Sequence, residues 1–167
     1  MSAGGIERLG ERSSGGKPSA AKAWLKAIEL TSRIEAAPRR LFADVVEDIA
    51  KRQPERPALI SEQETFTYGA LAGRINQYAR WAQAAGIKRG GTVCLLMTSR
   101  PDYVACWLGV SRVGGVVALL NTRLIGASLA HCINVSGADH IILAKDQANV
   151  FESARPHLAR TPKVWSV

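Results

Sequence analysis

Residues 90–124 read GGTVCLLMTSRPDYVACWLGVSRVGGVVALLNTRL. Within them, the apolar run at residues 93–97 is too short for a helix and suits a strand that is buried on both faces. Residues 116–120 form a second apolar run, rich in β-branched side chains. The apolar residues between the two runs recur with the period of a helix that packs on a sheet. A strand, a covering helix and a second strand predict a right-handed parallel crossover.

The predicted helix between the two strands carries start and stop signals. Ser99 is placed to cap it, Pro101 fits the first turn, where a missing N–H costs nothing, and Asp102 puts negative charge at the positive end. Gly114 and Gly115 end the helix. The side chains that this pattern turns toward the sheet are Tyr103, Val104, Trp107, Leu108 and Val110.

The composition is that of an ordinary globular domain. A chain of 167 residues, 47% of them hydrophobic and 22% charged, is about one domain long and can bury a core. Its sequence contains no apolar run long enough to span a bilayer, and residues 1–17 hold no secretory signal. We therefore expect a cytoplasmic chain.

A net charge of +8 raises the question of an anionic partner. The basic residues come as scattered pairs with acidic residues between them, and no predicted helix presents a basic stripe with stacking aromatic side chains. This pattern argues against nucleic acid and favours a solvated surface, with an anionic ligand or a membrane surface as the alternatives.

Three segments are expected along the chain. Residues 1–18, rich in Gly, Ser and charge, form a flexible tail. Residues 19–37 contain an amphipathic, basic helix. Through residues 19–35 this helix either lies peripherally on a membrane or docks on its own globule or on a partner chain. The apolar side of this helix holds Trp24, Leu25 and Ile28. Residues 38–167 form an α/β subdomain.

Helices and strands alternate through the last segment. Residues 58–60 and 65–68 flank a polar turn and predict a small β-hairpin. Thr67 can cap the helix that follows and Gly86 can end it. Its inward residues are Leu71, Ile75, Tyr78, Ala79 and Ala82. Further helices are predicted at residues 41–52, 126–135 and 146–158, and further strands at residues 140–143 and 163–167. The fold class is therefore α/β, with a layered, mostly parallel sheet flanked by helices.

The sequence shows no catalytic or metal-binding motif. Gly115 stands where a phosphate-binding loop needs its lysine, so the glycines near it do not form such a loop. No set of Ser, His and Asp can be assembled as a nucleophilic site. The histidines, His131, His140 and His157, have no metal-like spacing. The cysteines, Cys94, Cys106 and Cys132, are predicted to be small buried hydrophobic residues.

Ligands of open α/β sheets bind beyond the carboxyl ends of the strands. Residues 98–99, 121–123 and 144–145 follow three predicted strands. They are either the lips of a ligand crevice or ordinary loops and helix caps.

The sequence from Phe66 to Leu143 resembles the N-terminal part of the AMP-forming acyl-CoA synthetases, which are adenylate-forming ligases. The hairpin and its helix, the strand GGTVCL, the SRPDY segment and the glycine-rich stop before the next strand follow the order of that family. ALLNTRLIGASLAHCI, at residues 118–133, is most similar to the very-long-chain acyl-CoA synthetase and fatty-acid transport protein branch. The resemblance covers residues 41–167.

The resemblance implies a reaction in which ATP and Mg²⁺ activate a fatty acid to an acyl-adenylate, from which coenzyme A takes the acyl group. It also implies that the phosphate loop, the ligand of Mg²⁺ and the catalytic lysine of the complete enzyme have no counterpart in these residues. No catalytic residue, bound cofactor or metal is therefore expected here. The residues that the resemblance places near the coenzyme A channel are Asn121 and Thr122.

Two hypotheses follow. The chain is either the N-terminal fragment of a long-chain fatty acid:CoA ligase, inactive alone and partnered by the remainder of the ligase, or a non-catalytic module that binds an acyl chain, coenzyme A or another protein. A sheet cut at this position exposes an edge, so the second hypothesis also predicts a homo-oligomer.

Overall fold

The computed structural model describes residues 19–36, 41–62 and 64–167. The chain divides into two compact units, residues 1–39 and residues 40–167. In the first unit, α1 (Ala20–Ala36) forms the helix expected from the amphipathic pattern. The predicted tail at residues 1–18 lies outside the described residues. None of the helices that the structure describes is long and apolar enough to cross a membrane.

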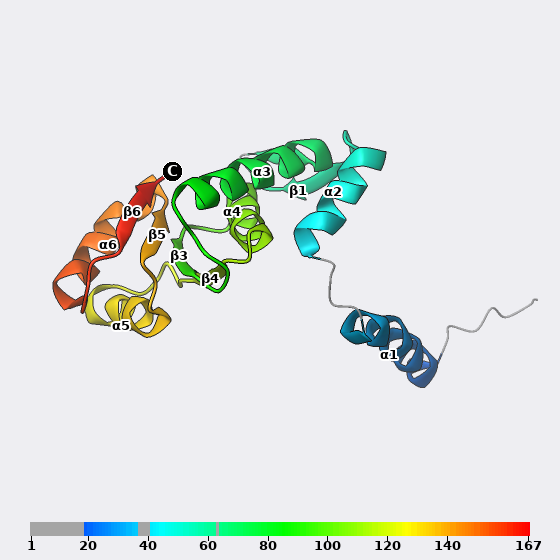
Figure 1. The fold of residues 1–167 in the computed structure, drawn as a ribbon, viewed down its shortest axis with the longest axis horizontal. Coiled ribbons are helices and arrows are strands. Elements are labelled where there is room, and N and C mark those ends of the chain that lie inside the picture. Colours follow the sequence, from blue (N-terminus) through cyan, green and yellow to red (C-terminus); the bar gives the residue numbers. More distant parts are fainter. Residues whose placement is uncertain (1–18, 37–40, 63) are drawn as a thin grey trace, which may run out of the picture. The chain divides into compact units, whose positions relative to one another are not determined.

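The second unit is built on a four-stranded sheet in which all neighbouring strands are parallel (Figure 1). In spatial order the strands are β4 (Val116–Leu119), β3 (Thr92–Leu96), β5 (His140–Leu143) and β6 (Lys163–Ser166). In the register, Cys94 lies between Ala118 and Ile141. The parallel crossover predicted from residues 90–124 is therefore confirmed.

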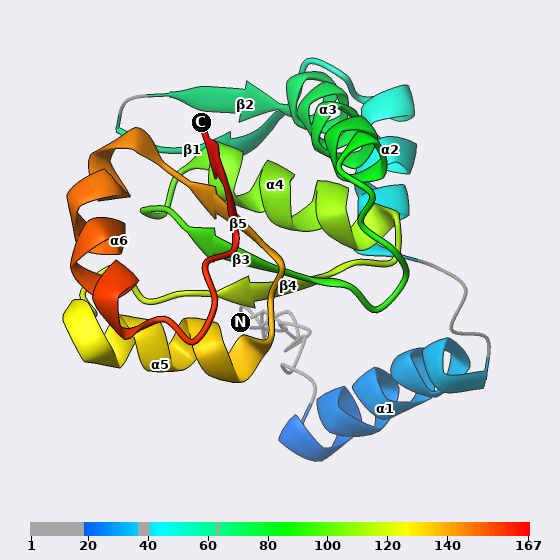
Figure 2. The same ribbon diagram turned by 60° about the vertical axis from the view of Figure 1, so that its left-hand side comes forward.

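Helices cover both faces of this sheet (Figure 2). One face is covered by α2 (Phe42–Arg52), α3 (Tyr68–Ala84) and α4 (Pro101–Arg112), which bury one core with the odd-numbered residues of β3. The other face is covered by α5 (Gly126–Ser136) and α6 (Ala148–Ala154), which bury a second core with the even-numbered residues. Two layers of apolar side chains thus hold the strands in place, as the alternation of side chains along a strand requires.

The small hairpin lies apart from the main sheet. β1 (Pro57–Ile60) and β2 (Thr65–Thr67) pair antiparallel, as predicted. Thr67 Oγ1 accepts a hydrogen bond from Ala70 N at 3.2 Å, so the predicted cap of α3 is confirmed. Gly86 has a φ of 77° just beyond the end of that helix.

Several local predictions were wrong in detail. Arg100, not Ser99, is the N-cap residue of α4, and the helix has no side-chain cap. Trp107, predicted to face the sheet, is 39% exposed. Small residues take the inner positions instead, because α3 packs so closely on α4 that a Cβ on Gly109 would lie 2.7 Å from Ile75 O.

Three further predictions needed correction. The apolar run at residues 116–120 also suits a buried strand, but β4 is an edge strand, so its Val116 and Leu119 are exposed. Cys132 is only half-buried. The helix predicted at residues 146–158 is broken, because α6 is flanked by the 3₁₀ turns η1 (Lys145–Gln147) and η2 (Arg155–His157).

Candidate functional site

The helices that follow the neighbouring strands β3 and β5 lie on opposite faces of the sheet. β3 continues through α4, on one face, to β4, whereas β5 continues through α6, on the other face, to β6. In open α/β sheets, ligands bind beyond the carboxyl ends of two such strands, where the connections run to opposite faces. The switch point between β3 and β5 is therefore the candidate ligand site of this fold.

The structure brings two of the predicted lips together at this switch point. Thr98 and Ser99, both exposed, follow β3, and the exposed Lys145 follows β5. The two segments are joined directly, because Ala144 N donates a 3.0 Å hydrogen bond to Leu96 O. Two hydroxyl side chains and one cation therefore stand at the same edge of two paired strands.

The third predicted lip lies one strand away. Asn121 and Thr122 follow β4, which pairs with β3 on the side away from β5. Asn121 Oδ1 accepts a hydrogen bond from Arg123 N at 2.9 Å, so its side chain shapes the loop. Asn121 and Arg123 are exposed and Thr122 is half-buried. The loop thus presents a cation at the carboxyl edge of the sheet.

Two buried polar atoms near the switch point have no hydrogen-bond partner among the described residues. They are Nε of Arg100, which follows Ser99, and Oε1 of Gln147, in the turn that follows β5. Gln147 is only 8% exposed. A buried polar atom without a partner is uncommon in a folded protein, and a water molecule or an ion is one group that can satisfy it. Sequence reasoning missed both atoms, because no motif distinguishes a paired side chain from an unpaired one.

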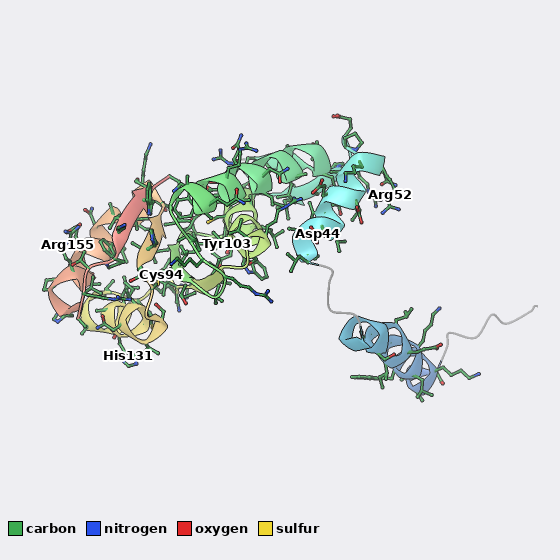
Figure 3. The ribbon with its side chains drawn as sticks, in the orientation of Figure 1. Asp44, Arg52, Cys94, Tyr103, His131 and Arg155 are labelled. Atoms are coloured by element: carbon green, nitrogen blue, oxygen red, sulfur yellow. The ribbon has the colours of Figure 1, made fainter. Side chains whose placement is uncertain are left out.

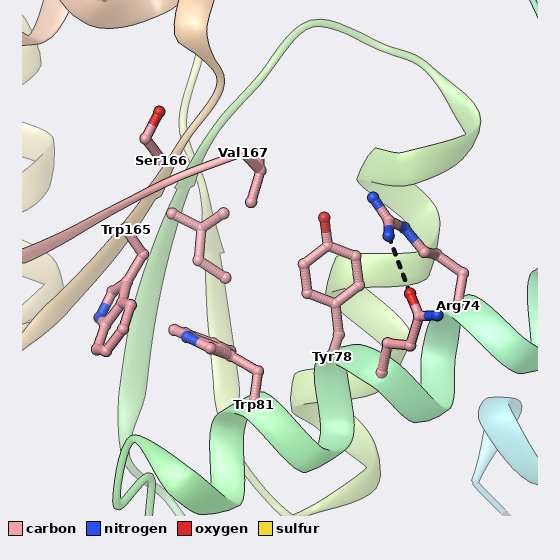
Figure 4. Close-up of a pocket in the computed structure, with 8 residues that line it drawn as sticks. Arg74, Tyr78, Trp81, Trp165, Ser166 and Val167 are labelled. Atoms are coloured by element: carbon pink, nitrogen blue, oxygen red, sulfur yellow. Dashed lines mark hydrogen bonds between the residues drawn. The ribbon is translucent and has the colours of Figure 1, made fainter.

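A second hollow lies between α3 and β6. It encloses about 240 Å³ and is mostly apolar, with Trp81, Trp165 and Ile142 among its walls. The rings of Trp81 and Trp165 meet edge to face, with their centroids 5.3 Å apart. Figure 4 shows the two indoles next to each other, with Tyr78 and Arg74 farther along α3. We call this hollow the Trp81–Trp165 cleft.

Arg74, which lines that cleft, forms a part-buried ion pair with Asp102. Arg74 Nε lies 2.6 Å from Asp102 Oδ1, and Tyr78 OH donates a 2.6 Å hydrogen bond to Asp102 Oδ2. Burial, with Asp102 beside it, raises the pKa of the Tyr78 hydroxyl, so Tyr78 stays protonated at neutral pH. The hydrogen bond to Asp102 raises the pKa of Arg74. Arg74 is thus held by Asp102, and the other walls of the cleft, among them Trp81, Ile142 and Trp165, suit apolar groups.

The two buried cysteines, Cys94 and Cys106, are poorly suited to act as nucleophiles. Burial raises the pKa of the Cys94 and Cys106 thiols, so neither is a thiolate at neutral pH. Cys94 and His131 lie on different elements in Figure 3. Within the described residues, no group of three or more His, Cys, Asp or Glu side chains could hold a metal ion.

Comparison with known proteins places this fold in a family. Residues 46–166 match the family model described as AMP-binding enzyme. The chain belongs to the AMP-binding enzyme family. The match begins within α2 and ends in β6, so it spans the sheet and both helical layers but not α1.

Curated relatives in this family are named as fatty acid transport proteins. Human long-chain fatty acid transport protein 6 is 35% identical over 119 residues, which are 71% of this chain and 19% of the relative. Rat long-chain fatty acid transport protein 2 is 31% identical over 135 residues, 80% of this chain and 22% of the relative. The chain therefore spans about a fifth of the length of these relatives.

Solved structures of adenylate-forming enzymes share the fold. The N-terminal domain of FACL13 from Mycobacterium tuberculosis superposes with a TM-score of 0.68 at 23% identity, over 75% of this chain and 33% of that one. A benzoate CoA ligase from Burkholderia xenovorans LB400 gives a TM-score of 0.70 at 20% identity, over 77% of this chain and 26% of that one. The α/β fold implied by the family resemblance is confirmed.

Proposed function

We propose that this chain supplies the N-terminal architecture of a long-chain fatty acid:CoA ligase. The observation that carries the proposal is the match of residues 46–166 to the AMP-binding enzyme family, together with relatives named for long-chain fatty acids. In the complete ligase, ATP and Mg²⁺ would activate the fatty acid to an acyl-adenylate, and coenzyme A would then accept the acyl group. The role of this part is to position helices and strand ends around the reacting molecules.

The chain alone is proposed to be inactive. Transfer of an adenylyl group needs cations and backbone donors fixed around the phosphates, since they stabilise the charge that develops in the transition state. The sequence contains no Gly-rich loop with a lysine that could supply them. Exchange of labelled pyrophosphate into ATP in the presence of a fatty acid tests this proposal, and a complete fatty acid:CoA ligase serves as the positive control.

Asn121 and Thr122 are proposed to lie at the mouth of the coenzyme A channel. The support is their position after β4 at the carboxyl edge, beside the exposed guanidinium of Arg123. The phosphates of coenzyme A are anionic, and a cation on a shaped loop is a suitable partner for them. The Arg123→Gln variant should bind coenzyme A more weakly than the wild type. Lys163→Gln, at the opposite edge of the sheet, should bind it as the wild type does.

A non-catalytic binding module is the second candidate function. The Trp81–Trp165 cleft favours it, because an apolar hollow beside an open sheet edge can accept an acyl chain or another protein. Calorimetric titration of the chain with coenzyme A and with a long-chain acyl-CoA separates the two functions. Micromolar binding would support the module, and no binding would leave the ligase fragment.

The helix α1 is proposed to bring a cytoplasmic chain into peripheral contact with membranes. Trp24, Leu25 and Ile28 are 70%, 67% and 54% exposed, while Lys22 and Lys26 lie on the polar side of the helix. A helix with exposed aromatic and aliphatic side chains opposite cations suits the surface of an anionic bilayer. Deleting residues 1–37 should then reduce partitioning onto vesicles that contain phosphatidylserine, and unchanged partitioning would contradict this contact.

A further inference from the structure

A polar hollow lies between the carboxyl ends of α3 and α4. It encloses about 520 Å³, and its walls are Asn76, Ala79, Arg80, Gln83, Ile87, Arg112 and Val113. Figure 2 shows the two helix ends close together. Ile87 leads into β3 and Val113 leads into β4, so the hollow lies at the amino edge of the sheet, opposite the candidate ligand site. We call it the Arg80–Arg112 hollow.

Most of the polar side chains in this hollow have no partner among the described residues. Two of them are the guanidinium groups of Arg80 and Arg112, and two are the carboxamides of Asn76 and Gln83. Among the described residues that line the hollow, none is acidic. No hydrogen bond or ion pair joins the side chains of Asn76, Arg80 and Gln83 to any other described residue. Positive charge together with free N–H groups favours an anion that has several oxygen atoms.

Arg112 is held on one side only. Its Nη2 forms an ion pair with Glu47 on α2, and Glu47 Oε1 also lies 3.2 Å from Lys51 Nζ. Hydrogen bonds from Arg112 and Lys51 lower the pKa of Glu47, so this carboxylate is ionised at neutral pH. Two cations thus share one carboxylate, and the cluster stays positive. Nη1 of Arg112 is buried without a partner among the described residues, a cost that a bound acceptor would remove.

The two helix ends oppose an anion only weakly. The last carbonyl groups of a helix carry partial negative charge, which hydrogen bonds from turn N–H groups offset. At the end of α3, Gly86 N donates to Gln83 O at 3.0 Å. At the end of α4, Gly114 N donates to Ser111 O at 3.0 Å. Arg89 brings another positive charge to this edge, since a Cβ on Gly114 would lie 3.1 Å from Arg89 Cγ.

We propose that the Arg80–Arg112 hollow binds a phosphate group. The phosphate lies between the two guanidinium groups, and the amides of Asn76 and Gln83 donate to its remaining oxygen atoms. The hollow has room for the phosphate and for a small group that carries it. The phosphate is either free in solution or part of a lipid headgroup. This inference goes beyond the ligase proposal and does not rest on it.

Titration of the whole chain with inorganic phosphate, at constant ionic strength, tests the site. The arginine Nε–H signals in nuclear magnetic resonance spectra should shift saturably. Arg80→Gln removes a side chain without a partner among the described residues, so the fold should persist while the dissociation constant rises about tenfold. Arg155→Gln removes the same charge next to α6, on the other face of the sheet, and should leave the constant unchanged.

A third variant should act in the opposite direction. Glu47→Gln removes the carboxylate that competes for Arg112, and phosphate should then bind about threefold more tightly. A purely structural role of these side chains would not produce this gain. Far-ultraviolet circular dichroism checks that all three variants are folded.

Phosphatidylcholine vesicles with and without phosphatidate distinguish the two sources of phosphate. For a lipid headgroup, Arg80→Gln should partition less than the wild type onto phosphatidate vesicles, and Arg155→Gln should partition equally. For free phosphate, all three proteins should partition alike, since each retains α1, and only the titration should separate them. No saturable shift together with equal partitioning, or equal losses in Arg80→Gln and Arg155→Gln, would overturn the proposal. These outcomes are independent of pyrophosphate exchange, which tests the ligase proposal.

Discussion

Tyr78 OH donates a 2.6 Å hydrogen bond to Asp102 Oδ2 and so ties the middle of α3 to the first turn of α4. Asp102 is only 7% exposed, and its other carboxylate oxygen is 2.6 Å from Arg74 Nε. Three polar side chains thus satisfy one another at the junction of two helices that cover the same face of the sheet. The junction fixes where α4 begins, and hence where the loop after β3 lies.

Removing the hydroxyl of Tyr78 should weaken this junction. In Tyr78→Phe, the buried carboxylate of Asp102 loses one of its two partners, and the free energy of unfolding should fall by about 1–3 kcal/mol. Urea denaturation measures the change. Tyr103→Phe, on α4, is the matched control and should have a smaller effect, since no hydrogen bond joins the Tyr103 hydroxyl to another described residue. Equal losses in the two variants would contradict this role of Tyr78.

The crossing of α3 and α4 should depend on the glycine at its centre. A Cβ at position 109 would lie 2.5 Å from Tyr78 Cβ and 2.7 Å from Ile75 O, so Gly109→Ala must push the helices apart. The expected loss is about 1–3 kcal/mol in the free energy of unfolding. Gly73→Ala is the control, because its Cβ would meet nothing within 4 Å, and a stabilisation of about 0.5–1 kcal/mol is expected. Thermal or urea unfolding that ranks the two variants in the reverse order would refute the close packing.

The helical periods predicted the inner face of α3 in full and that of α4 with one error, because Leu108 and Val110 are buried as predicted whereas Trp107 is exposed. All five residues expected to face inward on α3 are buried, because their spacing matches one face of a helix that packs over a sheet. On α4, hydrophobicity favoured Trp107, whereas the inner face holds Ala105 and Gly109, since helices that cross closely need small residues at the contact. That requirement comes from the partner helix, which the α4 sequence does not reveal.

The sequence predicted the position of the candidate site at the edge of the sheet, but not the side-chain pairs within it. The rule for open sheets places the segments after β3 and β5 at one edge, and the structure joins them through Ala144 N and Leu96 O. Arg74 and Asp102 are 28 positions apart in the sequence, and the residues flanking each of them do not predict that the two side chains pair. The unpaired Nε of Arg100 is likewise a property of the packed structure.

Protonation of His140 should destabilise the β5–β6 pair. His140 Nδ1 accepts a 3.0 Å hydrogen bond from Trp165 Nε1, which requires this nitrogen to be unprotonated. Burial, with Lys163 nearby, lowers the pKa of His140 below its ordinary 6.5, and the weaker effect of Asp139 opposes this. Between the two pKa values the unfolded chain binds more protons, so the free energy of unfolding should fall as the pH drops below about 6.5.

Thermal unfolding at a series of pH values tests the role of His140. The wild-type melting temperature should fall between about pH 7.5 and pH 5. The decrease should be smaller in His140→Gln, which cannot be protonated, and it should persist in His131→Gln, whose side chain is exposed on α5. A wild-type pH profile that matches that of His140→Gln would show that His140 does not cause the decrease.

The proposal that these residues supply architecture rather than catalysis is tested most directly by measuring adenylate formation by the purified chain of residues 1–167. With ATP, Mg²⁺ and a long-chain fatty acid, we predict no exchange of labelled pyrophosphate into ATP above the protein-free blank, because the groups that stabilise the transferring phosphates are missing from this sequence. The complete ligase, assayed alongside, should give clear exchange. Exchange by the chain itself, dependent on the fatty acid, would contradict the proposal that these residues supply architecture rather than catalysis.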